Sequence, residues 1–349
     1  MRRLVFITQQ VDPAHRALAA VVPQLHALAR RVDEVVVLTD AGVDGALPPN
    51  ARIKPFRAPA RALRGARFAA ALAPELRLRN GRVAVLAHMC PIYAVLAAPL
   101  TRPLRVRTLL WYAHWNPTRT LRVAEQLVTK VVSTDVRSFP LASDKVVATG
   151  QAIDVDRFTC RERRSGAQTE AIALGRYSPA KGYEQILHAV AQIENTRLRV
   201  YGPTLTEEEV QHKRDLRELV TNLQLLERVE LHDAVPRSEI PQLLAQTDVL
   251  VNNMRAGTSD KVVYEACASC VPAIASNPVF DDVLPEEWRF GREDVTALAQ
   301  RLHAFAALDD VARAELGRRL REHVLARHSV ESWADRIVAV AGLAASASS

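Results

Sequence analysis

The first half of the chain alternates short apolar runs with longer amphipathic stretches. Residues 4–8, 34–39 and 83–87 are largely hydrophobic, as expected of parallel strands buried on both faces. Residues 14–30 carry apolar side chains at helical spacing, with Asp12 as the expected N-cap. A strand, a helix and a strand at this spacing predict a βαβ unit. Further strands are expected at 52–56, 107–112, 130–133 and 145–149.

The same alternation restarts after a polar and charged segment. Residues 159–169 lack apolar periodicity, so we interpret them as a linker. Strands are expected beyond it at 171–174, 198–201, 229–232, 248–253 and 273–276. Helices are expected at 184–193, 207–226, 237–247, 261–270, 296–308, 312–327 and 330–345. The pattern predicts an α/β protein with a first domain (1–158), a linker (159–169), a second domain (170–328) and a C-terminal helical segment (329–349).

Composition places the chain among globular proteins and bears on its location. It has 349 residues, of which 48% are hydrophobic and 24% are charged, enough for two domains with their own cores. No apolar run approaches the roughly 18 residues that a membrane span needs. Residues 1–8 are better explained as a buried strand than as a signal peptide. The four cysteines form no disulfide framework, so we expect a cytoplasmic protein.

Positive charge is concentrated in the first half. Residues 1–155 hold 22 Lys and Arg against 10 Asp and Glu, a net charge of +12, and the remainder has −5. This asymmetry favours an anionic partner, although an arginine-rich composition would also produce it. We expect four arginines to share one helical face: Arg57, Arg61, Arg64 and Arg67. This face could bind the anionic inner surface of the membrane, or it could simply be exposed to solvent. Nucleic-acid binding is not expected, because few aromatic residues lie among them.

The clearest chemical signal is a polar loop that joins a strand to a helix. Residues 257–260 follow the strand at 248–253 and precede the helix at 261–270, whose start Ser259 or Asp260 can cap. The free N–H groups and the dipole of such a helix terminus favour an anion, typically a phosphate. Glu265, further into the helix, could accept hydrogen bonds from the hydroxyls of a ribose.

A second signal follows the strand at 171–174. Gly175 and Arg176 come directly after it, and Lys181 and Gly182 precede the next helix. Arginine binds two phosphate oxygens at once, and lysine adds a mobile positive charge. Gly182 allows the backbone to turn tightly beside them. This spacing is suited to holding a diphosphate.

These stretches resemble the nucleotide-sugar site of the retaining family 4 glycosyltransferases, which have the GT-B fold. Residues 265–272 resemble the family's Glu-Ala-Met-Ala-Cys-Gly-x-Pro, and residues 175–182 resemble Gly-Arg-x4-Lys-Gly. Residues 150–158 are similar to its Asn-Gly-Val-Asp-x3-Phe. The first glutamate of the family's Glu-x7-Glu, which touches the donor sugar, falls on Gly257. We expect Asp260 and Lys261 to take over part of its work.

The resemblance implies two Rossmann-like domains that face a central cleft, with the acceptor in the first and the donor in the second. It implies that a sugar moves with retention from a UDP- or GDP-sugar to a lipid-linked, glycan or small-molecule acceptor, with no bound metal and no cofactor. The donor-binding residues would be Gly175, Arg176, Lys181, Thr258, Ser259, Asp260, Lys261 and Glu265.

The remaining site predictions concern the first domain. By the same resemblance His114 lies beside the donor sugar, so that the catalytic residues would be His114, Arg176 and Lys181; a buried structural histidine is the alternative. The acceptor side would include Gln10, Asp12, His15 and Trp115. No residue is assigned as a general base, because in the family the leaving phosphate is thought to help take the acceptor proton.

Two other functions stay open, and two weak signals are set aside. A degenerate domain could bind a nucleotide or glycan without transfer, as a subunit of an assembly system, and a nucleotide-sugar epimerase could use the same fold. The Cys267–Cys270 spacing lacks the second pair that structural zinc usually needs, so we expect Cys267 to pack in the core. Asp281 and Asp282 form a lone acidic pair and are assigned no metal.

Overall fold

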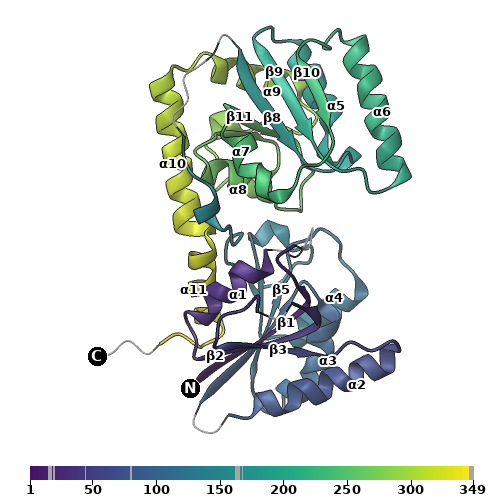
Figure 1. Cartoon of the computed structure of the whole chain (residues 1–349), viewed down its shortest axis with the longest axis vertical. Helices are drawn as coiled ribbons and strands as arrows, with labels where there is room; N and C mark the ends of the chain where they lie inside the picture. The colour runs from purple at the N-terminus through teal and green to yellow at the C-terminus, as the bar shows by residue number, and fades with distance from the viewer. Residues whose placement is uncertain are drawn as a thin grey trace. The chain divides into compact units, whose positions relative to one another are not determined.

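The chain forms two compact units, each built on a parallel sheet. The structure is a computed structural model that describes residues 1–14, 18, 20–43, 45–78, 81–161, 166 and 168–345. Unit 1 comprises Met1–Asp154 and Arg327–Ser349, and unit 2 comprises Val155–Ala326 (Figure 1). Both sheets are entirely parallel and alternate with helices, so the predicted α/β class is confirmed.

Unit 1 contains a seven-stranded sheet in the order β3-β2-β1-β4-β5-β6-β7. Its strands are β1 (Arg2–Val11), β2 (Glu34–Gly42), β3 (Ala51–Pro55), β4 (Arg82–His88), β5 (Arg107–Trp111), β6 (Lys130–Ser133) and β7 (Val146–Ala148). Its helices are α1 (Val21–Ala29), α2 (Arg61–Leu72), α3 (Pro91–Thr101), α4 (Arg119–Leu127) and α11 (Val330–Val340). The order reverses between β1 and β4, and ligands of such sheets bind where the order reverses, at the carboxyl ends of the strands.

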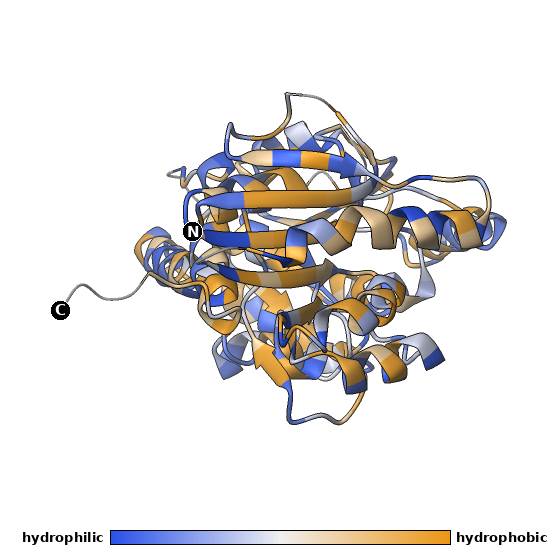
Figure 2. Cartoon of the chain, turned by 90° about the horizontal axis from the view of Figure 1, so that it is seen from below, coloured by the Kyte–Doolittle hydropathy of each residue, from blue (hydrophilic) through white to orange (hydrophobic). Residues whose placement is uncertain are grey.

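Alternating side chains of the strands build two cores in unit 1. Leu4 and Phe6 of β1 pack with α1 and α11 on one face of the sheet. Val5 and Ile7 pack with α2 and α3 on the other. The central part of β1 is therefore hydrophobic on both faces, and Figure 2 shows long orange segments in the strands of this sheet. The C-terminal helix α11 thus belongs to the core of unit 1, where Trp333 is fully buried.

Unit 2 repeats the architecture with five strands in the order β10-β9-β8-β11-β12. The strands are β8 (Thr169–Leu174), β9 (Thr196–Tyr201), β10 (Val229–His232), β11 (Val249–Asn252) and β12 (Ala273–Ala275). The helices are α5 (Tyr183–Ala191), α6 (Glu207–Asn222), α7 (Ile240–Leu244), α8 (Lys261–Ala268) and α9 (Val295–Ala306), and α10 (Asp310–His328) runs from unit 2 into unit 1. The order reverses between β8 and β11.

Three expectations about local structure are wrong. Helix α1 begins at Val21 rather than at residue 14, and Asp12 instead accepts a hydrogen bond from the N–H of Ala14. Helix α2 begins at Arg61, so Arg57 precedes the helix and the four arginines do not share one helical face. A disulfide joins Cys160 to Cys270. Cys160 and Cys270 are 110 residues apart, a pairing that no local spacing reveals.

None of the helices in the described part of the chain is both long and apolar enough to cross a membrane.

Candidate functional site

The two sequence signals of unit 2 meet where its strand order reverses. Gly175 follows β8, and the polar loop follows the neighbouring strand β11. The loops are fastened together by backbone and side-chain hydrogen bonds: the N–H of Arg255 donates to the carbonyl of Ala180 (3.0 Å), and Asn253 Nδ2 donates to that of Gly182 (3.2 Å). Folding therefore places residues 175–182 beside residues 253–260.

Glycines make room for Lys181 in this arrangement. A Cβ atom at Gly175 would lie 2.4 Å from Lys181 Nζ, and Gly175 has a φ of 145°. Gly182 has a φ of 58°, and its added Cβ would lie 2.3 Å from the side-chain nitrogen of Asn253. Larger residues would therefore collide with the lysine or strain the turn. The tight turn expected at Gly182 is confirmed.

Lys181 forms an ion pair with Asp260, the residue before α8. Asn252 Nδ2 also donates to Asp260 Oδ2, at 2.8 Å. The side chains of Lys181 and Asp260 are 13% and 15% exposed, so water screens their attraction only partly. Two residues predicted to bind the donor thus lie together, and Asp260 is bound to one of the cations.

The expected capping of α8 is wrong. Asp260 is the N-cap residue, but its side chain accepts no hydrogen bond from the helix. Ser259 Oγ instead donates to the hydroxyl of Tyr264, at 3.0 Å. The first amides of α8 therefore have no side-chain acceptor from either residue. Since the carboxylate of Asp260 is attracted by a lysine from another loop, the tertiary contact overrides the local capping preference.

Glu265 is almost completely buried in α8, with a side-chain exposure of 1%, and forms an ion pair with Arg237. Its second oxygen, Oε2, is buried without a hydrogen-bond partner among the described residues. Thr258 Oγ1, in the loop before the helix, has the same status. A buried carboxylate oxygen without a hydrogen-bond donor lowers the stability of the folded state. Such an unpartnered oxygen is typical of a group that accepts a hydrogen bond from a ligand hydroxyl.

Arg176 extends from the end of β8 to Glu209 of α6. Glu209 also accepts from the N–H of Leu205 (2.6 Å), while Thr206 caps the helix by accepting from the N–H of Glu209 (3.2 Å). Burial raises the pKa of Glu209, but hydrogen bonds from Leu205 and Arg176 lower it more, so the pKa lies below its ordinary value. The guanidinium of Arg176 is half exposed and so can reach an anion.

Lys261 is the first residue of α8. Burial lowers the pKa of its amine to about 8, the positive charge of Arg237 acts in the same direction, and Glu265 opposes them. Lys261, Arg237 and Glu265 therefore form one electrostatic group at the start of α8.

In unit 1, His114 lies in the loop after β5. Its Nδ1 accepts from the N–H of Asn116 (3.2 Å), and its ring stacks on Trp115, with centroids 5.5 Å apart. His114 is half-buried and Trp115 is exposed, so the alternative of a fully buried structural histidine does not fit. The buried histidine of this edge is His88, which stacks on Phe6.

The residues expected on the acceptor side lie partly at the carboxyl end of β1. Gln10 Nε2 donates to Asp12 Oδ2 at 3.4 Å, so these two side chains are together. His15 lies outside the described residues. The side chain of Trp115 is on a different loop of the same unit, after β5.

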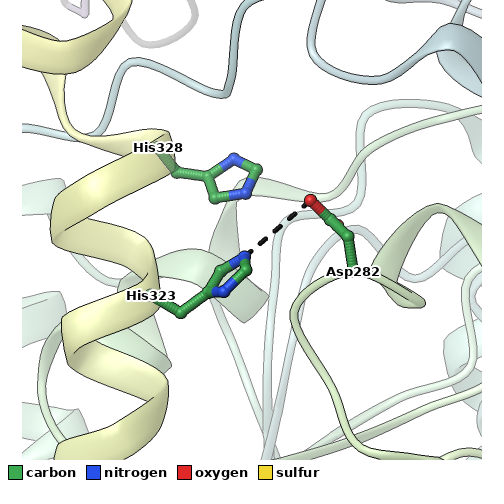
Figure 3. Close-up of side chains that lie close together, drawn as sticks. All are labelled: Asp282, His323 and His328. Carbon is green, nitrogen blue, oxygen red and sulfur yellow. Dashed lines mark ion pairs between the residues drawn. The ribbon is translucent and has the colours of Figure 1, made fainter.

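The acidic pair of unit 2 is engaged in separate ion pairs. Asp281 lies 2.7 Å from Arg289 Nη1. Asp282 lies 3.8 Å from His323 Nε2, as the dashed line in Figure 3 shows. Cys267, of the cysteine pair, is fully buried, as expected.

Four residues that hold this site together were not predicted from the sequence: Glu209, Arg237, Asn252 and Asn277. Asn277 Nδ2 donates to the carbonyls of Thr258 (2.8 Å) and Arg255 (3.0 Å) and so shapes the polar loop. The spacing of Thr206 and Glu209 is that of a capping box, which could have identified Glu209. Arg237 carries no local signal, because it reaches Glu265 only through the fold.

Comparison with known proteins relates this site to sugar-transferring enzymes. Residues 160–285 match the model of the family Glycosyl transferases group 1. The chain is 27% identical over 196 residues to WcaL of Escherichia coli, whose name assigns it to colanic acid biosynthesis as a glycosyltransferase. The match covers 52% of this chain and 47% of WcaL. The chain spans about half the length of the curated relatives it matches, including WcaL of Salmonella typhimurium at 25% identity and 49% coverage.

Solved structures with the same fold match nearly the whole chain. Sucrose-phosphate synthase from Thermosynechococcus elongatus has a TM-score of 0.73 at 18% identity, covering 97% of this chain and 98% of that one. Anabaena HepE in complex with UDP has a TM-score of 0.74 at 16% identity, covering 98% and 100%. The two parallel-sheet domains thus have the GT-B fold, as predicted.

Proposed function

We propose that the chain is a glycosyltransferase that takes a sugar from a nucleoside-diphosphate-sugar donor and transfers it to an acceptor with retention. The observation that carries the proposal is Glu265, a buried carboxylate with one oxygen unpartnered, on the helix that begins beside Lys181. This site lies within the region that matches Glycosyl transferases group 1. HepE, whose fold is similar, has been solved with UDP.

Each group has a distinct role in the proposed reaction. Glu265 accepts hydrogen bonds from the ribose hydroxyls of a UDP- or GDP-sugar. Arg176, Lys181 and the first amides of α8 stabilise the diphosphate as the bond from the anomeric carbon to its oxygen breaks. The acceptor oxygen forms the new bond to that carbon and loses its proton, which the leaving phosphate helps to take. His114 positions the sugar.

The acceptor side and the cellular setting are part of the same proposal. Gln10, Asp12, His15 and Trp115 would contact a lipid-linked, glycan or small-molecule acceptor. The positive charge of the first half would bring the protein to an anionic membrane surface from the cytoplasm. Transfer would proceed without a bound metal, so a chelator such as EDTA should leave the rate unchanged.

The first test is thermal stability with UDP, GDP, ADP, CDP and their common sugar conjugates. A ligand at 100 times its dissociation constant adds about 2.7 kcal/mol of stability, which is readily seen as a higher melting temperature. We expect one nucleotide to raise the melting temperature of the wild type, and Arg176→Ala to lose most of the effect. Arg318→Ala is the control, because Arg318 pairs with Glu315 on the surface of α10.

A second function is favoured by one observation, the glycine at position 257 in place of the family's first glutamate. The chain could then bind a nucleotide or glycan as a subunit of an assembly system without transferring sugar. Nucleotide binding without turnover of any donor would favour this function. Turnover can be followed by nuclear magnetic resonance of the anomeric proton, which also reports retention.

A further inference from the structure

Three of the cations near the proposed diphosphate and ribose positions are each paired with a carboxylate of unit 2. Arg176 pairs with Glu209, Lys181 with Asp260 and Arg237 with Glu265. The six side chains together carry no net charge. A diphosphate that binds here must therefore compete with internal carboxylates for its cations.

Asp260 differs from the other two carboxylates. Glu209 also accepts from the amide of Leu205 near the start of α6, and Glu265 lies in the middle of α8 with one oxygen left for a ligand. Asp260 sits in the N-cap position, directly before the amides proposed to bind phosphate, yet its side chain accepts no hydrogen bond from them. Its described partners are Lys181 and Asn252.

We propose that Asp260 acts as an internal competitor of the donor diphosphate: it holds Lys181 in position and weakens the binding of the nucleoside diphosphate that remains after transfer. The inference rests on the proposed function of the site. It assigns to Asp260 a role in specificity and product release, in place of the sugar contact expected from the sequence.

The physical reason is the repulsion between like charges at short range. A phosphate that reaches Lys181 also comes close to the carboxylate of Asp260. Because the side chains of Lys181 and Asp260 are largely buried, water screens the repulsion between the phosphate and this carboxylate only partly. A free nucleoside diphosphate carries an additional negative charge compared with a sugar nucleotide, because its terminal phosphate ionises a second time near pH 6. Asp260 therefore opposes the product more strongly than the donor.

The Asp260→Asn variant tests this role with little change of shape. Asparagine removes the negative charge, and its side-chain oxygen can still contact Lys181. We expect UDP, or whichever of UDP, GDP, ADP and CDP binds the wild type, to bind the variant about tenfold more tightly by calorimetry at pH 7.5. The matching sugar nucleotide should gain less. Asp260→Ser, which also suits an N-cap position, repeats the test if the asparagine variant does not fold.

The control is Glu315→Gln on α10, which removes one negative charge from an exposed ion pair of the same unit. It should bind the nucleotide as the wild type does. Equal tightening in the control would show a general effect of net charge and overturn the inference.

The other outcomes separate the inference from the proposed function. If the wild type binds a nucleotide and Asp260→Asn binds it equally or less tightly, Asp260 is not a competitor, while the donor site stands. Weaker binding of only the sugar nucleotide would instead favour a contact with the donor sugar. If neither protein binds any of the four nucleotides, the proposed function and this inference both fail. Binding by the variant alone would support the inference.

Discussion

At the scale of single residues, Lys261 is a cation of the candidate site whose pKa is shifted toward neutral pH. Burial, followed by the charge of Arg237, lowers the pKa of its amine to about 8. The opposing effect of Glu265 is smaller. Lys261 therefore loses its proton in a range where the phosphates of a nucleotide are already fully ionised, so that the two titrations can be separated.

Nucleotide affinity should fall as the pH rises from 7 to 9. Deprotonation removes a positive charge from the start of α8, where the diphosphate is proposed to bind, so we expect a loss of roughly fivefold, about 1 kcal/mol. Calorimetric titrations with UDP or GDP at several pH values measure the change. Lys261→Arg should flatten the profile, because arginine keeps its charge. An unchanged profile in Lys261→Met would contradict the assignment.

The same pKa has a consequence for stability, with the opposite dependence on pH. The folded chain binds the Lys261 proton less tightly than the unfolded chain, so between pH 8 and 10.5 the unfolded chain holds more of this proton. The contribution of Lys261 to the free energy of unfolding therefore rises with pH through this window. Below this window the partly buried ammonium lowers the free energy of unfolding, and Lys261→Met should remove that cost.

At the scale of elements, α11 is the helix on which unit 1 depends although it comes last in the sequence. Trp333 is fully buried and its ring meets that of Trp111 of β5 edge to face, with centroids 5.6 Å apart. Arg31, just after α1, forms ion pairs with Glu331 and Asp335 of α11, at 2.7 Å and 2.6 Å. The C-terminal helix thus completes the core on one face of the sheet.

Trp333→Ala should destabilise unit 1 by about 3–5 kcal/mol, the usual cost of removing a large buried aromatic side chain. Urea denaturation followed by circular dichroism measures the change. Ala339→Ser, at an exposed position of the same helix, is the control and should be nearly neutral. A loss below 1 kcal/mol for Trp333→Ala would mean that α11 is not part of the stable core.

Helix α2 is the element proposed to meet an anionic membrane. Arg61 and Arg67 are exposed, as is Arg57 just before the helix, and Leu63 is 45% exposed between them. Arg64 differs, because it is half-buried and donates to the carbonyl of Ala58 (3.1 Å). Three of the four arginines, rather than all four, are therefore exposed to a membrane surface.

Replacing Arg57, Arg61 and Arg67 with glutamine should weaken binding to vesicles of phosphatidylglycerol and phosphatidylcholine. Each cation near an anionic surface contributes about 1 kcal/mol, so we expect a loss of two orders of magnitude at low salt. Vesicle sedimentation measures it. Arg214, Arg318 and Arg319, exposed arginines of unit 2, serve as a triple control with the same change of charge. Equal losses in both triples would show that α2 has no special role.

At the scale of the whole molecule, the Cys160–Cys270 disulfide joins the first residues of unit 2 to the turn just after α8. Arg321 of α10 strengthens the same connection by donating to the carbonyls of Phe158 and Ala268. Cys90 and Cys267 are free and buried, and burial raises the pKa of the Cys267 thiol to about 12, so this neighbouring thiol is unreactive.

Breaking the disulfide should lower the stability of unit 2 by about 2–4 kcal/mol, because the closed loop spans 110 residues. Chemical denaturation with and without a reductant measures the difference, and the double variant Cys160→Ser, Cys270→Ser should match the reduced wild type. Cys90→Ser is the control and should keep its response to the reductant. Mass spectrometry that found all four thiols free in air-oxidised protein would rule the bond out.

More of the fold than of the candidate site can be predicted from the sequence alone. Strands β6 and β10 begin and end at the predicted residues, and in β6 the pattern is informative because Val131 and Val132 are fully buried. The start of α1 differs from the prediction, because the helix begins at Val21 rather than at residue 14. Local periodicity therefore identified the elements more reliably than their ends.

For this protein the sequence by itself determined the alternation of strands and helices, the two-domain α/β class and the glycine, lysine and glutamate positions of the candidate donor site. These depend on local spacing and on residue type. Only the tertiary structure decided the partners: Asp260 for Lys181, Arg237 for Glu265 and Cys270 for Cys160. The physical reason is that the packing of the sheet determines which loops come together. The partners are 28 to 110 residues apart in the sequence, so their local sequence patterns do not indicate the contact.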